Sequence, residues 1–158
     1  MKRLIQAAAL TLTIASFNST VYGYSQIKSK NFPYIVGADQ FPKTRARVVR
    51  DSLRLKIPSD SRALSQLTIT VPNGLTVRNE IAISDQSNQK TNAKITVKDK
   101  TITIAFPEQI APGTELKIDL NRVLISGISN SWLFPVSVRL VGLNADIPIG
   151  VFRLQLVF

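Results

Sequence analysis

The most regular feature of the sequence is an alternation of apolar and polar residues that begins near Ser52 and continues to the end of the chain. A two-residue period places the apolar side chains on one face of a strand. The apolar runs are short, and the first two end at turn-forming residues, at Pro58 and at Pro72-Asn73-Gly74. The alternating apolar residues are, run by run, Leu53/Leu55/Ile57, Leu67/Ile69/Val71, Leu75/Val77, Ile81/Ile83, Ile95/Val97, Ile102/Ile104/Phe106, Leu116/Ile118/Leu120, Trp132/Phe134/Val136/Val138/Leu140 and Phe152/Leu154/Leu156/Phe158. The pattern predicts about eight short strands.

The connections between these runs favour an all-β fold. Lys98-Asp99-Lys100 lies between two alternating runs, where a tight hairpin turn is expected. Residues 107–114 contain Pro107 and Pro112-Gly113 and are expected to form a loop. No helical period follows residue 44. We therefore predict an antiparallel β-sandwich of the immunoglobulin-like kind, because two half-polar sheets bury their apolar faces only against each other. A small β-barrel is the alternative.

The first residues have the organisation of a secretory signal. Lys2 and Arg3 give a positive start, residues 4–16 are uncharged, and the small residue Gly23 offers a cleavage point. The uncharged run is shorter than the roughly 20 residues that a membrane-spanning helix needs. We expect residues 1–23 to be removed and the protein to be exported, to the periplasm or the extracellular space, with no transmembrane segment after cleavage.

Two further parts of the chain follow the signal. Residues 24–44 are rich in Ser, Lys, Pro and Gly and alternate poorly, so they are predicted to be an N-terminal arm. Residues 45–158 are predicted to form the β-sandwich domain. With 44% hydrophobic and 19% charged residues, the composition is that of a globular protein.

The amino acids that are absent exclude several chemistries. The chain has no Cys, so it can form no disulfide and offers no thiolate nucleophile. It has no His, so a Ser-His-Asp triad is impossible. The commonest ligands of zinc, Cys and His, are therefore both missing. Calcium is the metal that remains conceivable, but no Asp-rich calcium loop is found. The carboxylates, for example Glu108, Glu115 and Asp119, are scattered. We expect no enzyme, no cofactor and no metal site, with a carboxylate-based hydrolase as the less favoured alternative.

Of all the features of the sequence, the excess of positive charge says most about a possible binding function. The net charge is +10, and without residues 1–23 it is +8, from 18 Lys and Arg against 10 Asp and Glu. Residues 28–56 alone contribute +6. Basic segments of this kind bind polyanions, although Lys and Arg also keep edge strands soluble and unpaired. The candidate binding residues are Arg45, Arg47, Arg50, Arg54 and Lys56.

These five cations do not lie on one face of a regular strand. Arg45 and Arg47 share one parity, and Arg50, Arg54 and Lys56 share the other. They converge only if the chain bends, and the break in alternation over residues 48–52 is where a bend or bulge is expected.

Five stretches of the sequence are similar to a known family: residues 52–58 (SLRLKIP), 63–69, 102–106, 110–114 and 147–154 (IPIGVFRL). Together they resemble the exported cyanobacterial proteins of domain-of-unknown-function family 2808, over roughly residues 45–158. The resemblance implies export, a bacterial origin and one compact domain.

The sequence thus leads to an exported structural or binding module of the bacterial envelope or periplasm. A protein that binds polyanions, such as acidic polysaccharide or lipid head groups, is the alternative. An anionic envelope polymer or another protein is the expected kind of partner, and nucleic acid is not.

Overall fold

The computed structural model describes residues 31–44 and 46–157, and these residues form ten β-strands. The strands are β1 (Tyr34–Phe41), β2 (Val48–Lys56), β3 (Leu64–Thr70), β4 (Leu75–Val77), β5 (Ile81–Asp85), β6 (Lys94–Lys98), β7 (Thr101–Ile110), β8 (Glu115–Ile125), β9 (Ser131–Leu140) and β10 (Ile147–Gln155). No helix in this part of the chain is long and apolar enough to cross a membrane. The predicted signal sequence lies outside the described residues.

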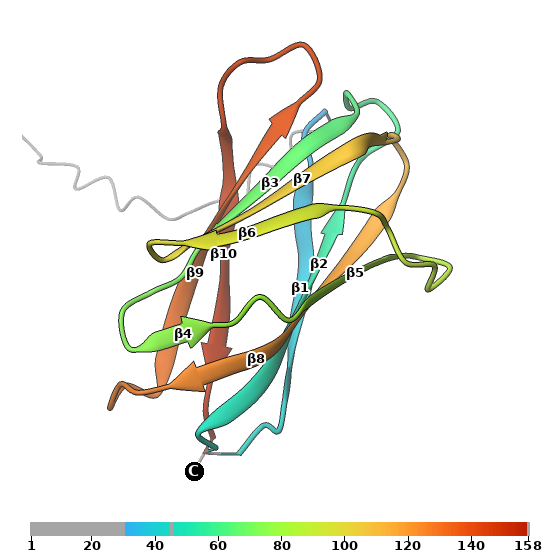
Figure 1. Cartoon of the computed structure of the whole chain (residues 1–158). Coiled ribbons are helices and arrows are strands. Elements are labelled where there is room, and N and C mark those ends of the chain that lie inside the picture. Colours follow the sequence, from blue (N-terminus) through green and yellow to red (C-terminus); the bar gives the residue numbers. More distant parts are fainter. Residues whose placement is uncertain (1–30, 45, 158) are drawn as a thin grey trace, which may run out of the picture.

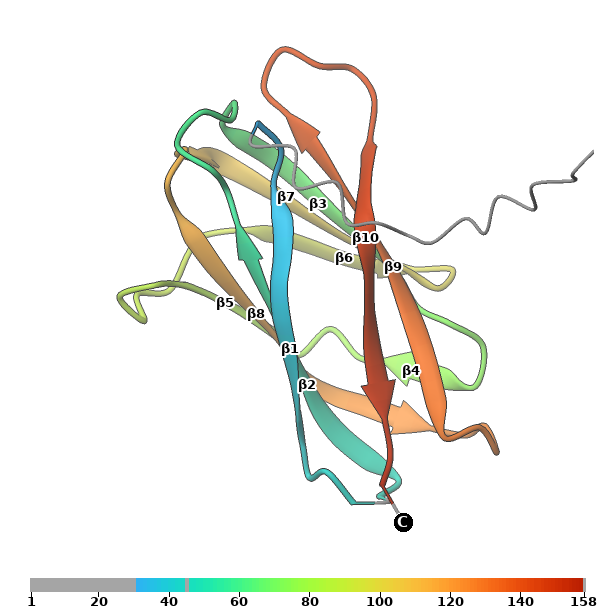
Figure 2. The same cartoon turned by 180° about the vertical axis from the view of Figure 1, so that it is seen from behind.

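The strands are arranged in two antiparallel sheets that face each other (Figures 1 and 2). One sheet has the order β1-β2-β8, and β4 and β5 pair with successive parts of the other side of β8, at residues 123–125 and 116–120. The second sheet has the order β10-β9-β3-β7-β6. The predicted antiparallel β-sandwich is confirmed, and the alternative of a closed barrel is not what forms.

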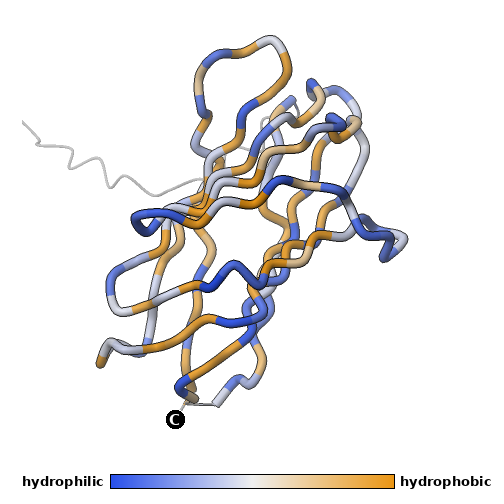
Figure 3. Tube along the Cα trace, in the orientation of Figure 1, coloured by the Kyte–Doolittle hydropathy of each residue, from blue (hydrophilic) through white to orange (hydrophobic). Residues whose placement is uncertain are grey.

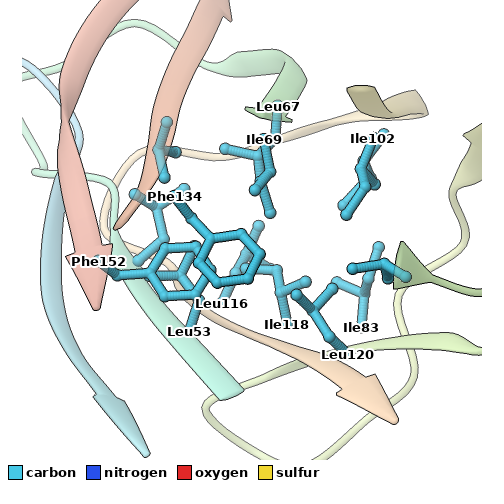
Figure 4. Close-up of a cluster of buried hydrophobic side chains, with 14 of the residues drawn as sticks. Leu53, Leu67, Ile69, Ile83, Ile102, Leu116, Ile118, Leu120, Phe134 and Phe152 are labelled. Atoms are coloured by element: carbon cyan, nitrogen blue, oxygen red, sulfur yellow. The ribbon is translucent and has the colours of Figure 1, made fainter. Parts of the chain in front are cut away.

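The core lies between the sheets and is made of the alternating apolar residues. Phe134 of β9 and Phe152 of β10 stack with ring centroids 4.6 Å apart, next to Leu53 of β2 (Figure 4). Trp132 and Phe134, which share the parity of the other apolar residues of β9, are buried. Figure 3 shows the alternation of hydrophobic and hydrophilic residues along the strands. Burial of one face of each strand is what made the strands recognisable in the sequence.

Strand β1 lies within the segment 24–44 that the sequence analysis assigned to an arm. It pairs with β2 along its length, and a bulge between Ile35 and Gly37 shifts the register. The bulge moves apolar residues from one parity to the other, since both Ile35 and Ala38 pack against the core. An edge strand with an interrupted period shows no clear alternation in the sequence, which is why β1 was not predicted. Because β1 belongs to the sheet, the sandwich begins before residue 45.

Two connections show how turn residues act. At the β6–β7 turn, Asp99 and Lys100 both have positive φ, 47° and 63°, as in the tight hairpin turn that was predicted. The expected loop at residues 107–114 is shorter than predicted, because β7 continues to Ile110. Pro107 is tolerated there because β7 bulges: residues 106–109 lie outside its paired positions with β3 and β6.

Candidate functional site

Strand β2 carries three of the five candidate cations on its outer face. Arg50 and Arg54 are exposed and alternate with buried residues, and Lys56 follows at the end of the strand. Residues two apart on a strand face are separated by about 6.6 Å. The three side chains therefore form a row along β2 rather than one compact cluster.

The cations in this row differ in what they contact. The Arg50 guanidinium lies 5.8 Å from the ring centroid of Phe41, its partner on β1. The Arg54 Nε is 3.9 Å from a carboxylate oxygen of Asp39, and both side chains are exposed, so the ion pair is weak. The Lys56 ammonium donates a 2.7 Å hydrogen bond to the carbonyl of Gly113. Among the described residues, neither Arg50 nor Lys56 has an acidic partner, but the Lys56 ammonium is held by a backbone carbonyl whereas Arg50 lies only against an aromatic ring.

Arg47 lies at the end of the sandwich, just before β2 begins. It has the parity of the buried Val49, yet it is exposed. Its carbonyl accepts a 2.9 Å hydrogen bond from the Ile125 amide at the end of β8. Its side chain lines a shallow hollow of about 230 Å³ together with Ala46, Ile125, Gly127, Ser129 and Leu156. Arg45, the fifth candidate, is outside the described residues.

The bend or bulge expected in the chain at residues 48–52 is not found in β2, whose inward residues Val49, Asp51, Leu53 and Leu55 keep a two-residue period. The register between β2 and β8 shifts between Val49 and Asp51, and the extra residue belongs to β8, where Asn121 and Arg122 lie opposite Arg50. Arg50 lies on the outer face because the alternation of β2 is unbroken, and Arg47 immediately precedes the strand at the end of the sandwich. The structure therefore brings Arg47 and Arg50 to the same end of the molecule and leaves Arg54 and Lys56 further along the strand.

Asp51 is a buried carboxyl group that sequence reasoning did not single out. It is 1% exposed, and neither carboxylate oxygen has a hydrogen-bond partner among the described residues. Burial raises the pKa of Asp51 to about 7; the nearby Ser52 amide opposes this rise in part, and the Asp39 charge adds to it. The signal was available in the sequence, since Asp51 shares its parity with Leu53 and Leu55.

The other carboxylates do not form a recognisable reaction centre. Asp119 accepts a hydrogen bond from the Ser52 hydroxyl and lies 3.3 Å from the Lys117 ammonium. Asp85 and Glu108 line one shallow polar hollow, but Asp85 Oδ1 accepts hydrogen bonds from the Ser87 and Gln89 amides of its own turn. Within the described residues, no group of three acidic side chains is placed to hold a metal ion.

Several solved structures have a similar fold. One is the N-terminal domain of the Streptococcus gordonii adhesin Sgo0707, with 12% sequence identity and a TM-score of 0.53 over 80% of this chain and 32% of that one. Another is the pilus backbone protein RrgB of Streptococcus pneumoniae, with 11% identity and a TM-score of 0.53 over 67% of this chain and 51% of that one. A third is the major pilin subunit BcpA of Bacillus cereus, with 12% identity and a TM-score of 0.51 over 77% of this chain and 38% of that one. This chain spans about a third to a half of each of them. At such low identity the similarity concerns the fold alone.

A comparison with curated protein sequences finds no match. A family model does match, over residues 28–154, and it includes the segment of β1. This agrees with the structure, in which β1 is part of the sandwich, and it moves the start of the family resemblance from residue 45 to residue 28. The chain belongs to the family described as protein of unknown function, DUF2808.

Proposed function

We propose that this protein is an exported, non-enzymatic structural or binding module of the bacterial envelope or periplasm, and that it binds anionic polymers or lipid head groups through the basic end of β2. The similar domains of adhesins and pilins support a role outside the cytoplasm, because they are parts of surface proteins. The signal-like residues 1–23 support export independently. A cyanobacterial origin, implied by the family resemblance, belongs to the same proposal.

The observation that carries anion binding is the placement of Arg47 and Arg50. Both are exposed at one end of the sandwich, and neither has an acidic partner among the described residues. A guanidinium group offers planar, bidentate hydrogen bonding to phosphate, sulfate or carboxylate. Polyanion binding by such groups releases counterions, so the affinity falls steeply with salt.

Catalysis is the less favoured alternative because the carboxylates already have structural contacts. Asp85 supports its own turn and Asp119 pairs with Ser52 and Lys117. The buried Asp51 lines neither of the two hollows described above. Substrate turnover that is lost on replacing a single carboxylate would establish a hydrolase instead.

The test is binding to dextran sulfate at low and moderate salt. We expect the triple variant Arg45→Ala, Arg47→Ala, Arg50→Ala to bind at least tenfold more weakly, because each lost cation at a charged surface costs roughly 1 kcal/mol. The slope of log affinity against log salt should also become shallower.

A charge-matched control separates a site from a general effect of net charge. Lys90, Lys94 and Lys98 are exposed near the edge strand β6, and their replacement by Ala removes the same charge. If both triple variants lose the same affinity, the positive charge is only solubilising and the proposal is wrong.

A further inference from the structure

Four large apolar side chains are exposed at one end of the sandwich. They are Phe41 at the end of β1 (67% exposed), Val48 at the start of β2 (42%), Ile128 in the β8–β9 loop (96%) and Val157 after β10 (58%). Single exposed apolar residues are ordinary on a protein surface. A group contributed by four separate segments, at the end that also carries Arg47 and Arg50, indicates an interaction surface.

Backbone contacts hold these four segments together. Phe41 pairs with Arg50 across β1 and β2. The Val157 amide donates a 3.1 Å hydrogen bond to the Lys43 carbonyl, and the Leu156 amide donates a 2.9 Å bond to Asn130, two residues after Ile128. In Figures 1 and 2 the start of β2, the end of β1 and the C-terminal end of the chain lie at the same end of the sandwich. We call this surface the apolar-basic end; its residues are Phe41, Lys43, Arg47, Val48, Arg50, Ile128 and Val157.

The charge of this end has one sign. Residues 41–50, 123–131 and 155–157 contain four Lys and Arg and no Asp or Glu. The nearest acid in sequence is Asp51, which is buried and whose raised pKa keeps it largely neutral below pH 7. The apolar-basic end therefore presents exposed apolar side chains beside positive charge, and all of this charge comes from residues 43–50.

We propose that the apolar-basic end docks on an anionic lipid surface. This inference rests on the proposed anion binding and specifies its partner. Basic residues near a membrane are attracted to anionic head groups, and neighbouring apolar side chains are buried at the boundary between head groups and acyl chains. An anionic polysaccharide would engage Arg47 and Arg50 equally well, but it would leave Phe41 and Ile128 in water. The exposed apolar residues are what favour lipid over polymer.

The test is cosedimentation with vesicles of phosphatidylglycerol and phosphatidylcholine, compared with vesicles of phosphatidylcholine alone. The protein used is the secreted form, and its intact mass first establishes that residues 1–23 are absent, since an uncleaved leader would itself bind lipid. We expect binding only to vesicles that contain phosphatidylglycerol. Ile128→Asn should lower the partition coefficient about tenfold, which corresponds to the loss of one buried aliphatic side chain. Arg47→Gln and Arg50→Gln should lower it about fivefold each.

Two control variants match these changes elsewhere on the surface. Val151→Asn removes a half-exposed aliphatic side chain from β10, and Lys94→Gln removes a cation from β6. Both should bind vesicles like the unmodified protein. Circular dichroism and the melting temperature of each variant show whether it folds.

Parallel measurements with dextran sulfate distinguish the two proposals. If Ile128→Asn weakens binding to vesicles but not to dextran sulfate, the lipid inference is supported. Equal binding of Ile128→Asn and the unmodified protein to anionic vesicles overturns it, and if dextran sulfate is still bound through Arg47 and Arg50, the anion-binding proposal survives. Failure to bind either ligand at low salt overturns both.

Discussion

At the scale of single residues, Asp51 departs most from the pattern around it. It occupies an inward position of β2 between Val49 and Leu53, and it lies opposite Gln40 of β1 and Leu120 of β8. A charged carboxylate without hydrogen bonds is strongly unfavourable in such surroundings, so the neutral form is favoured. This is why burial raises the pKa of Asp51 to about 7.

The raised pKa of Asp51 predicts that the protein is more stable in weak acid than in weak base. The unfolded chain releases the proton of an aspartate near pH 4, whereas the folded protein holds it until about pH 7. Stability is therefore full below pH 4, falls as the pH rises through this window and levels off above pH 7, with a total loss of about 2–4 kcal/mol. The melting temperature at pH 5 should exceed that at pH 8, and no histidine titrates in this range.

The variant Asp51→Asn tests the assignment of this effect. An amide keeps the size of the side chain and cannot ionise, so the melting temperature of the variant should change little between pH 5 and pH 8. At pH 8 it should equal or exceed that of the unmodified protein. A variant whose pH dependence is unchanged would show that another group is responsible.

At the scale of elements, the sequence predicted strands well where one face is buried and poorly where it is not. Strands β2, β3, β8 and β9 alternate because their inward residues meet the opposite sheet. Strand β1 was missed because it is an edge strand with a bulge, and the end of β7 was missed because Pro107 lies in an unpaired stretch. The turns at residues 72–74 and 112–113 were recognisable because Gly and Pro restrict or widen the backbone conformation at their own positions. Bulges depend on the partner strand and leave no such mark in the sequence.

The turn before β4 requires glycine at position 74. Gly74 has φ of +86°, and a Cβ atom there would lie 3.1 Å from Gly127 Cα and 3.1 Å from the Trp132 indole nitrogen. Gly74→Ala should therefore combine backbone strain with a clash between the β3–β4 turn and the β8–β9 loop. We expect it to lower the free energy of unfolding by about 2–4 kcal/mol, as measured by urea denaturation.

Gly113 provides the matched control for this substitution. Its φ is +87°, and a Cβ atom there would meet nothing within 4 Å. Gly113→Ala should cost only the backbone strain, about 1–2 kcal/mol. Equal losses in the two variants would contradict the packing argument for Gly74.

At the scale of the whole molecule, the fold was predictable and the candidate site only in part. The periodicity of the apolar residues specifies two sheets with a shared core, and the composition indicates where positive charge is concentrated. The end of the sandwich that carries Arg47, Arg50, Ile128 and Val157 is assembled by backbone hydrogen bonds between segments far apart in the chain. No local pattern reports such contacts, so the apolar-basic end could be recognised only from the structure.

We predict that the folding unit begins at β1 rather than at residue 45. The sequence pattern places the start of the sandwich at residue 45, whereas the structure includes β1, whose Ile35 and Ala38 pack against the core and whose Gln40 side chain accepts a hydrogen bond from the Gln155 amide. A chain that covers residues 45–158 would lose these contacts and expose the edge of β2. We expect it to be less stable than residues 31–158 by at least about 2–3 kcal/mol in urea denaturation, and to aggregate more readily. Equal denaturation midpoints for the two chains would show that β1 is an accessory arm and that the sandwich is complete without it.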